Sequence, residues 1–146
     1  PELFAAIGVH SGLACGSARD LQTALAVMQR GMVGTPSARA GRLVPAIVFH
    51  GDQDKTVNAQ NGNDVVAQAV AGAELRRVVQ PRRQEGGRDC TRTVFTDDAG
   101  RVVTEQWLIH DAGHAWSGGK VVGTYTDPLG PDATTEMLRF FDEHPL

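Results

Sequence analysis

The sequence predicts an α/β domain built on a mostly parallel sheet, and two observations indicate this class. Residues 5–10 (AAIGVH) and 44–51 (VPAIVFHG) are apolar runs without alternating polar positions. Continuous apolar runs bounded by glycine or proline are typical of strands buried on both faces, as in parallel sheets. The segment between them has helical spacing, so the order is strand, helix, strand, which is the unit of a parallel α/β sheet.

Three segments have apolar residues at the spacing that is typical of helices. In the first segment, Ser17 followed by Asp20 resembles a capping box, and the apolar residues are Leu21, Leu25 and Met28. In the second, which Gly72 is expected to end, they are Val65, Val66, Ala69 and Val70. The third begins near Pro131 and Asp132, ends at His144, and is expected to bury Met137, Phe140 and Phe141.

Residues 90–110 predict a β-hairpin that is added to the parallel strands. Two β-rich runs flank the turn sequence DDAG at residues 97–100, which is a hairpin signal. The preceding stretch, residues 80–89, is polar, charged and contains glycine, so we expect an exposed loop there. The second arm of the hairpin continues directly into Gly113 and His114.

Length, composition and charge narrow the possible classes of protein. The chain has 146 residues, enough for one domain, and is 41% hydrophobic and 21% charged, as in ordinary globular proteins. A net charge of −3 provides no basic field for nucleic acid and no polybasic patch for a membrane, so we expect neither partner. The chain begins with Pro1 rather than Met and has no basic n-region, which suggests a cut or processed chain.

Two loops that follow strands carry residues suited to acid–base chemistry. Asp54 follows the run 44–51, and His114 follows the strand expected at 103–109. If these strands are neighbours, the carboxylate can reach Nδ1 of the imidazole, fix its tautomer and stabilise the imidazolium. Each residue also has a structural explanation, because Asp54 could cap the next helix and His114 could be a polar residue in a glycine-rich turn. Together they have the order of acid and base that follows the serine in α/β-hydrolases.

Two alternatives concern the same loops. Asp52 is a rival acid, but its spacing from Gly51 is too tight for the usual loop, so we favour Asp54. His110 and His114 are four residues apart, a spacing that places two imidazoles on one face of a helix and can bind a metal. Here the spacing crosses a strand end and a glycine, without accompanying carboxylate or cysteine ligands, so we expect no metal site.

A nucleophilic serine is not evident in the chain. The strained turn that exposes this serine has the pattern Gly-x-Ser-x-Gly, which the sequence does not contain. The nearest candidate is Ser11, but Val9 and Leu13 stand where the pattern requires glycines. Ser11 also follows a strand without opening a helix directly, so we interpret it as a turn residue near the site.

Four stretches of the chain resemble one family of secreted esterases. These are PELFAAIGVHSGL, VPAIVFHGDQDKTVN, TEQWLIHDAGHAWSGG and YTDPLGPDATTEMLRFFDEHP. They are similar to the second half of the polyhydroxybutyrate-depolymerase-type esterases, an α/β-hydrolase family with feruloyl and acetylxylan esterases among its relatives. The resemblance extends from Pro1 to Pro145. It implies that residues 1–146 are the C-terminal portion of a single α/β-hydrolase catalytic domain.

The resemblance also implies a serine esterase whose nucleophile is outside this chain. PELFAA resembles the stretch just after the helix that follows the nucleophile, so the serine would lie roughly 15–20 residues before Pro1, one helix and its turn. The oxyanion-hole donors would be outside the chain as well. Asp54 and His114 would be the acid and base for hydrolysis of a small or polymeric ester, without a cofactor, in a secreted or periplasmic protein. The partner of the chain would be the missing N-terminal half of the domain.

Three expectations remain open on the sequence. Trp116, two residues past the base, is expected to line the acyl or alcohol pocket, with plain core packing as the alternative. Cys15 and Cys90 form an isolated pair, compatible with a disulfide in an exported protein or with two buried thiols. The alternative function is a non-catalytic binding or interaction module that retains the hydrolase fold, in which case the upstream Gly-x-Ser-x-Gly pattern would be degraded.

Overall fold

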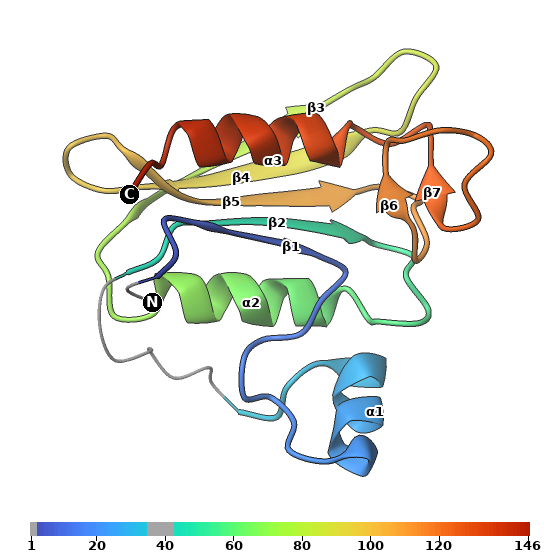
Figure 1. Ribbon diagram of the computed structural model, residues 1–146, viewed down its shortest axis with the longest axis horizontal. Coiled ribbons are helices and arrows are strands. Elements are labelled where there is room, and N and C mark those ends of the chain that lie inside the picture. Colours follow the sequence, from blue (N-terminus) through green and yellow to red (C-terminus); the bar gives the residue numbers. More distant parts are fainter. Residues whose placement is uncertain (1–2, 35–42) are drawn as a thin grey trace.

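A five-stranded sheet with helices on both faces forms the centre of the protein (Figure 1). The structure is a computed structural model that describes residues 3–34 and 43–146. The strands of the sheet are β1 (Ile7–His10), β2 (Ala46–Gly51), β3 (Arg76–Arg82), β4 (Cys90–Thr96) and β5 (Val102–Ile109). The helices are α1 (Leu21–Arg30), α2 (Gln60–Val70) and α3 (Ala133–Asp142). Two short strands, β6 (Trp116–Ser117) and β7 (Thr126–Asp127), pair in a second sheet.

The order of the strands brings the two functional loops together. The order is β1-β2-β5-β4-β3, in which β1, β2 and β5 are parallel and β4 and β3 are antiparallel. Strands β2 and β5 are direct neighbours, so their carboxyl ends meet at the same edge of the sheet. The predicted α/β class, with parallel strands and a hairpin formed by β4 and β5, is confirmed.

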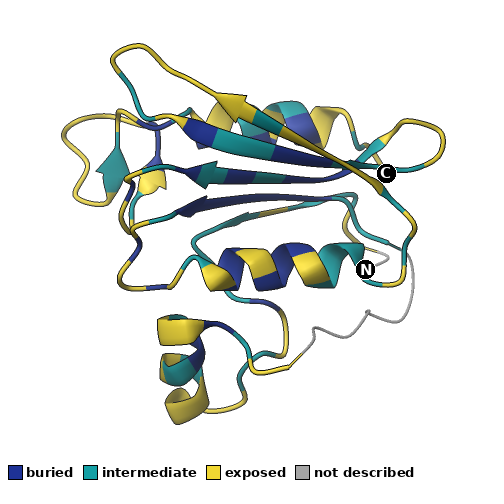
Figure 2. Ribbon diagram, turned by 180° about the vertical axis from the view of Figure 1, so that it is seen from behind, coloured by how far each residue is buried: buried dark blue, intermediate teal, exposed yellow. Residues whose placement is uncertain are grey.

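Each face of the sheet has its own hydrophobic core. Helix α2 covers one face and α3 the other, while α1 lies outside α2 (Figure 1). The cluster beneath α3 includes Phe49, Trp107 and Phe140, and the cluster beneath α2 includes Val48 and Val65. Every residue of β2 is buried (Figure 2), which explains why its sequence has no polar alternation. The pattern that predicted this strand therefore reflects burial on both faces.

The sequence analysis missed β3 altogether. Six of its seven residues are exposed, and residues 80–82, which were expected in a loop, belong to it. The strand is held by continuous antiparallel pairing with β4, from Arg76 opposite Thr96 to Arg82 opposite Cys90. Because β3 is an edge strand with little buried surface, no hydrophobic pattern marks it; its backbone pairing alone defines it.

Two details of the helices also differ from expectation. The N-cap of α1 is Asp20, whose carboxylate accepts a hydrogen bond of 2.8 Å from the backbone N–H of Thr23, so Ser17 is not the capping residue. In α3, Met137 and Phe140 are buried as predicted, but Phe141 is 37% exposed. Its ring lies over Gly8 of β1 and is not among the buried residues of the cluster beneath α3.

The disulfide between Cys15 and Cys90 is absent, and the position of each cysteine explains why. Cys90 is a free thiol buried in the cluster beneath α3. Cys15 lies on the other side of the sheet, where its backbone N–H and carbonyl bond to the side chain of Gln68 on α2. Burial raises the pKa of the Cys90 thiol, which keeps it protonated and unreactive.

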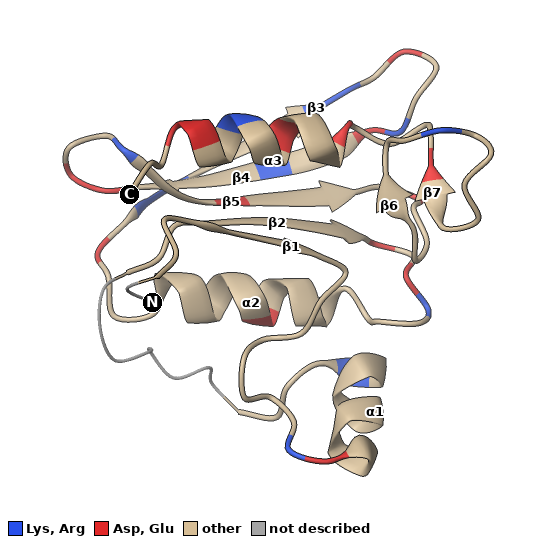
Figure 3. Cartoon of the chain, viewed as in Figure 1, with Lys and Arg blue, Asp and Glu red and all other residues tan. Residues whose placement is uncertain are grey.

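A buried carboxylate ties α3 to the sheet. Glu105 on β5 is fully buried and accepts hydrogen bonds from Arg92, Trp107 and, at 2.8 Å, Arg139 of α3. Residues of both charges lie along α3 (Figure 3). Burial raises the pKa of Glu105, but the hydrogen bonds and charge of Arg92 and Arg139 outweigh it and hold the pKa below its usual range. The carboxylate is therefore ionised in the folded protein.

Glu105→Ala is expected to lower the free energy of unfolding by about 3 kcal/mol, because it leaves two arginines without their buried partner. Urea denaturation at neutral pH measures the change. Glu136→Ala is the matched control, since Glu136 pairs with the same Arg139 at the surface and its removal should cost less than about 1 kcal/mol. If the two substitutions lowered the free energy of unfolding equally, the buried Glu105 carboxylate would contribute no more to stability than the surface Glu136.

Candidate active site

The acid loop begins where β2 ends and holds Asp54 in a fixed orientation. Asp54 is 6% exposed. One carboxylate oxygen, Oδ1, accepts hydrogen bonds from the backbone N–H groups of Thr56 (2.9 Å) and Val57 (2.8 Å). The other oxygen, Oδ2, faces the next loop and lies 2.8 Å from Nδ1 of His114. Two backbone donors on one oxygen leave the second oxygen to orient the imidazole.

His114 lies in the loop that follows β5, and its side chain is 35% exposed. Because the Asp54 carboxylate can only accept, Nδ1 of His114 carries the proton and donates it. In the neutral imidazole the lone pair is then on Nε2, and Nε2 has no hydrogen-bond partner in the part of the chain that the structure describes. The predicted contact between Asp54 and His114 is present, and it leaves a basic nitrogen open to a further group.

Backbone contacts hold the two loops side by side. The N–H of Asp52 donates to the carbonyl of Ile109 (3.0 Å), and the N–H of Gln53 donates to the carbonyl of Ala112 (2.9 Å). A Cβ atom at Gly51 would lie 2.3 Å from the Ala112 carbonyl oxygen, so only glycine permits this approach. The pairing of β2 with β5 thus extends beyond the strands and sets the distance between Asp54 and His114.

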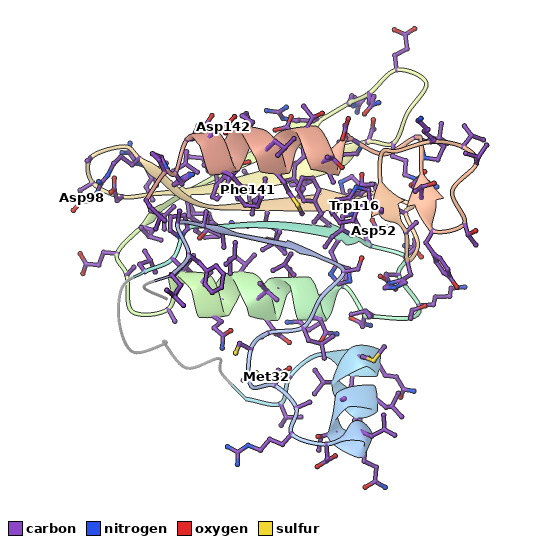
Figure 4. The ribbon with its side chains drawn as sticks, in the orientation of Figure 1. Met32, Asp52, Asp98, Trp116, Phe141 and Asp142 are labelled. Carbon is purple, nitrogen blue, oxygen red and sulfur yellow. The ribbon has the colours of Figure 1, made fainter. Side chains whose placement is uncertain are left out.

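Asp52, the rival acid, has a different histidine as its partner. Its Oδ2 lies 3.0 Å from Nδ1 of His110, and its Oδ1 accepts the backbone N–H of Asp111 at 2.8 Å. Asp111 has a φ of 57°, which is uncommon for a residue other than glycine. The Asp52 carboxylate therefore stabilises the strained turn that directs the chain toward His114. Asp52 and Trp116 lie at the end of the sheet where β2 and β5 end (Figure 4).

The spacing of His110 and His114 does not produce a metal site. Each histidine is paired with a separate carboxylate. Among residues 3–34 and 43–146, no group of three or more His, Cys, Asp or Glu side chains is arranged to hold a metal ion.

Two further histidines surround Asp54, and the sequence analysis did not identify them. His50 is buried on β2; its Nε2 donates to the Val57 carbonyl (2.8 Å) and lies 3.5 Å from Oδ2 of Asp54. His10 ends β1, and its Nε2 accepts the backbone N–H of Ser117 at 2.9 Å. Their positions at the ends of the two predicted parallel strands are the signal that could have indicated them, because strand ends meet at one edge.

A comparison with known protein families matches the chain to the esterase PHB depolymerase family over residues 1–91. The chain belongs to this family. The match covers more than half of the 146 residues and includes Asp54, but it ends before His114. No match was found among curated proteins. The family resemblance drawn from the sequence motifs is thereby confirmed, and it identifies the chain as esterase-like or depolymerase-like, within the hydrolases.

Three histidines, His10, His50 and His114, lie near Asp54. Burial, followed by the nearby His50 and His114, lowers the pKa of His10 to about 4, although Asp54 opposes the shift. Burial also lowers the pKa of His50. Both imidazoles are therefore neutral at neutral pH.

The low pKa of His10 predicts a loss of stability in mild acid. The unfolded imidazole titrates near its ordinary value of about 6.5, whereas the folded one titrates near 4. Between these values the unfolded chain binds the extra proton, so stability is complete above about pH 6.5 and decreases as the pH falls. The shift is equivalent to roughly 3 kcal/mol as an upper value. Urea denaturation at pH 6.5 and 4.5 should show the decrease in the wild type and a smaller one in His10→Gln.

Trp116 lies against the same cluster. Its ring stacks on His10, with centroids 4.8 Å apart, and its Nε1 donates to Oγ1 of Thr134. The residue is 38% exposed, so it is not plain core packing. The ring of His10 also stacks on Phe49, with centroids 5.8 Å apart. The imidazole of His10 therefore contacts two aromatic rings, and that of Trp116 is partly open to solvent.

In the described residues no helix is long and apolar enough to cross a membrane.

Proposed function

We propose that this chain supplies the acid and the base of a Ser-His-Asp triad in a carboxylic ester hydrolase with the α/β-hydrolase fold. The observation that carries the proposal is the contact of 2.8 Å between Asp54 and His114, which fixes the tautomer and leaves Nε2 open. Family membership supports the reaction class. The positions of acid and base after neighbouring parallel strands support the fold.

The nucleophile belongs to a segment that precedes Pro1. Strand β1 lies at the edge of the sheet, and within the described residues its outer side has no strand partner. An unpaired edge beside exposed apolar residues is a liability that a further strand would remove. The ring of Phe141, which is 37% exposed, lies over Gly8 of this strand. These features support the N-terminal half of the domain as the partner that pairs with β1.

The proposed reaction has two steps. The serine attacks the ester carbonyl while Nε2 of His114 takes its proton, and His114 then protonates the departing alcohol. Water next attacks the acyl-enzyme, with His114 again acting as the base, and releases the acid. Asp54 keeps Nδ1 protonated and stabilises the imidazolium in both steps. The chemistry requires no organic cofactor. Small or polymeric esters are the proposed substrates, and a secreted or periplasmic location is proposed with them.

The proposal predicts that residues 1–146 alone do not hydrolyse a short-chain nitrophenyl ester, whereas the protein extended through the upstream serine does. Acid and base activate a nucleophile but cannot replace one, and the oxyanion donors would be absent too; loss of the serine typically removes about 10⁶ of the rate. Spectrophotometric assays of nitrophenol release measure the hydrolysis rate of both proteins. If residues 1–146 alone hydrolyse the ester and Ser11→Ala abolishes this activity, the proposal is contradicted. It is also contradicted if the extended protein is folded and carries an intact serine motif but is inactive. That second result would favour a non-catalytic module.

A further inference from the structure

His50 is a buried imidazole near the end of β2 that the proposed reaction does not use. Helix α2 covers this face of the sheet (Figure 1), and a Cβ atom at Gly62 of α2 would lie 2.8 Å from Nδ1 of His50. Among residues 3–34 and 43–146, Nδ1 has no hydrogen-bond partner. A buried polar atom without a partner costs free energy, so the presence of an imidazole here calls for an explanation.

The surroundings of the two ring nitrogens fix the protonation state of His50. Nε2 lies 2.8 Å from the carbonyl oxygen of Val57, which can only accept, so Nε2 carries a proton. An imidazolium would need a second N–H at Nδ1, on the side that faces Gly62, where no described residue accepts it. Burial lowers the pKa of His50 more than the Val57 hydrogen bond and Asp54 raise it. His50 is therefore a neutral donor in one fixed tautomer.

This donor acts on both oxygens of the Asp54 carboxylate. The Val57 carbonyl accepts the proton of His50, and the Val57 N–H donates to Oδ1 of Asp54 at 2.8 Å. Nε2 of His50 also lies 3.5 Å from Oδ2 of Asp54, a distance at which its N–H dipole attracts the carboxylate without a hydrogen bond. Oδ2 is the oxygen that lies 2.8 Å from Nδ1 of His114. His50 therefore connects α2 and β2 to the contact between Asp54 and His114.

We infer that His50 is a positioning residue for Asp54, which holds Val57 and, through it, the carboxylate so that Oδ2 faces His114. Without the donor, the Val57 peptide and the carboxylate that it holds are free to turn. His114 then loses the acceptor that keeps its proton on Nδ1. Gly62 permits this position of the ring, because a Cβ atom there would displace it. The geometric part of the inference stands by itself, and its consequence for the rate rests on the proposed function.

The tautomer of His114 tests the inference without any activity. Nitrogen-15 NMR of residues 1–146 measures it at a pH well above the ordinary pKa of an imidazole. His50→Gln should keep Nδ1 of His114 protonated, because the glutamine amide places an N–H near the position of Nε2. His50→Asn has the same amide on a side chain too short to reach Val57, so both tautomers of His114 should be populated.

Gly62→Ala provides a second variant that changes no polar group. It should displace the ring of His50 and populate both tautomers of His114, as His50→Asn does. Alanine is the better helix former, so the change arises from the contact with the ring and not from a weaker α2. Urea denaturation of each variant shows that it is folded.

In the extended protein the rate should follow the tautomer of His114. His50→Asn and Gly62→Ala are expected to lower kcat for a nitrophenyl ester by roughly 10- to 100-fold, the usual effect of a misplaced supporting group. KM should change little, because Asp54 acts on the imidazole and not on the bound ester. His50→Gln should keep kcat within about 3-fold of the wild type, since its amide replaces the donor.

The outcomes separate this inference from the proposed function. If His50→Asn and Gly62→Ala lower the free energy of unfolding but leave the His114 tautomer unchanged, His50 supports only the fold and the inference is overturned. Should either variant fail to fold, the wild type still decides, because His50 must be protonated on Nε2 and unprotonated on Nδ1. The opposite tautomer of His50 would overturn its role. Inactivity of the extended wild type would instead refute the proposed function and leave the tautomer results of residues 1–146 standing.

Discussion

His114→Ala is expected to lower kcat of the extended protein by about 10⁶, nearly as much as removal of the nucleophilic serine. Residues of a triad act as a unit, so deletion of the base leaves the serine protonated and unreactive. The open Nε2 of His114 is the nitrogen that this substitution removes, and no other histidine replaces it. His10 has a pKa near 4 and both of its nitrogens are hydrogen-bonded. Steady-state kinetics on a nitrophenyl ester measure the change.

His110→Ala provides a matched control for this experiment. His110 has the same type of carboxylate partner, Asp52, and a side chain 36% exposed, against 35% for His114. Its Nε2, however, is 2.9 Å from Oγ1 of Thr91 rather than open. We expect His110→Ala to lower kcat by less than about 10-fold, through a looser loop alone. Equal decreases in kcat in the two variants would contradict the assignment of His114 as the base. Such a result would mean that both substitutions act by disordering the loops.

The sequence predicted the contact between Asp54 and His114 because both residues follow local patterns at strand ends. The apolar runs that become β2 and β5 marked where those strands end, and parallel neighbours place their ends together. The preference for Asp54 over Asp52 rested on loop spacing. In the structure the side chain of Asp54 turns toward His114, while that of Asp52 turns toward His110. Spacing could favour one acid, but only the fold shows that the other carboxylate has its own imidazole.

Other features depend on contacts between distant residues and left no local signal. His10 and Ser117 are 107 positions apart, and their hydrogen bond depends on β1 lying beside β2 and on the loop that carries β6. The same limit explains β3, an exposed edge strand defined by its pairing with β4. The sequence left the disulfide between Cys15 and Cys90 open for a related reason. Two cysteines in one sequence indicate a possible bridge, but the sheet between them separates Cys15 from Cys90.

Asp54→Asn is expected to lower kcat of the extended protein by about 10⁴, less than removal of the base. The geometry of the carboxylate explains the loss. Oδ1 accepts two backbone N–H groups, from Thr56 and Val57, so the carbonyl oxygen of an asparagine must take that place. Its NH₂ group then faces Nδ1 of His114 and can only donate. Nδ1 becomes the acceptor, the proton moves to Nε2, and the lone pair that should receive the serine proton is lost.

Two measurements test this account of Asp54→Asn. Nitrogen-15 NMR should show His114 protonated on Nδ1 in the wild type and on Nε2 in the variant, even in residues 1–146 without the nucleophile. Asp52→Asn is the matched control, because it alters the neighbouring pair with His110 and should leave the His114 tautomer unchanged. The rate should then fall only in the variant whose tautomer changes. A variant at Asp54 that keeps Nδ1 protonated and still loses about 10⁴ in rate would show that the carboxylate acts through its charge on the imidazolium and not through the tautomer.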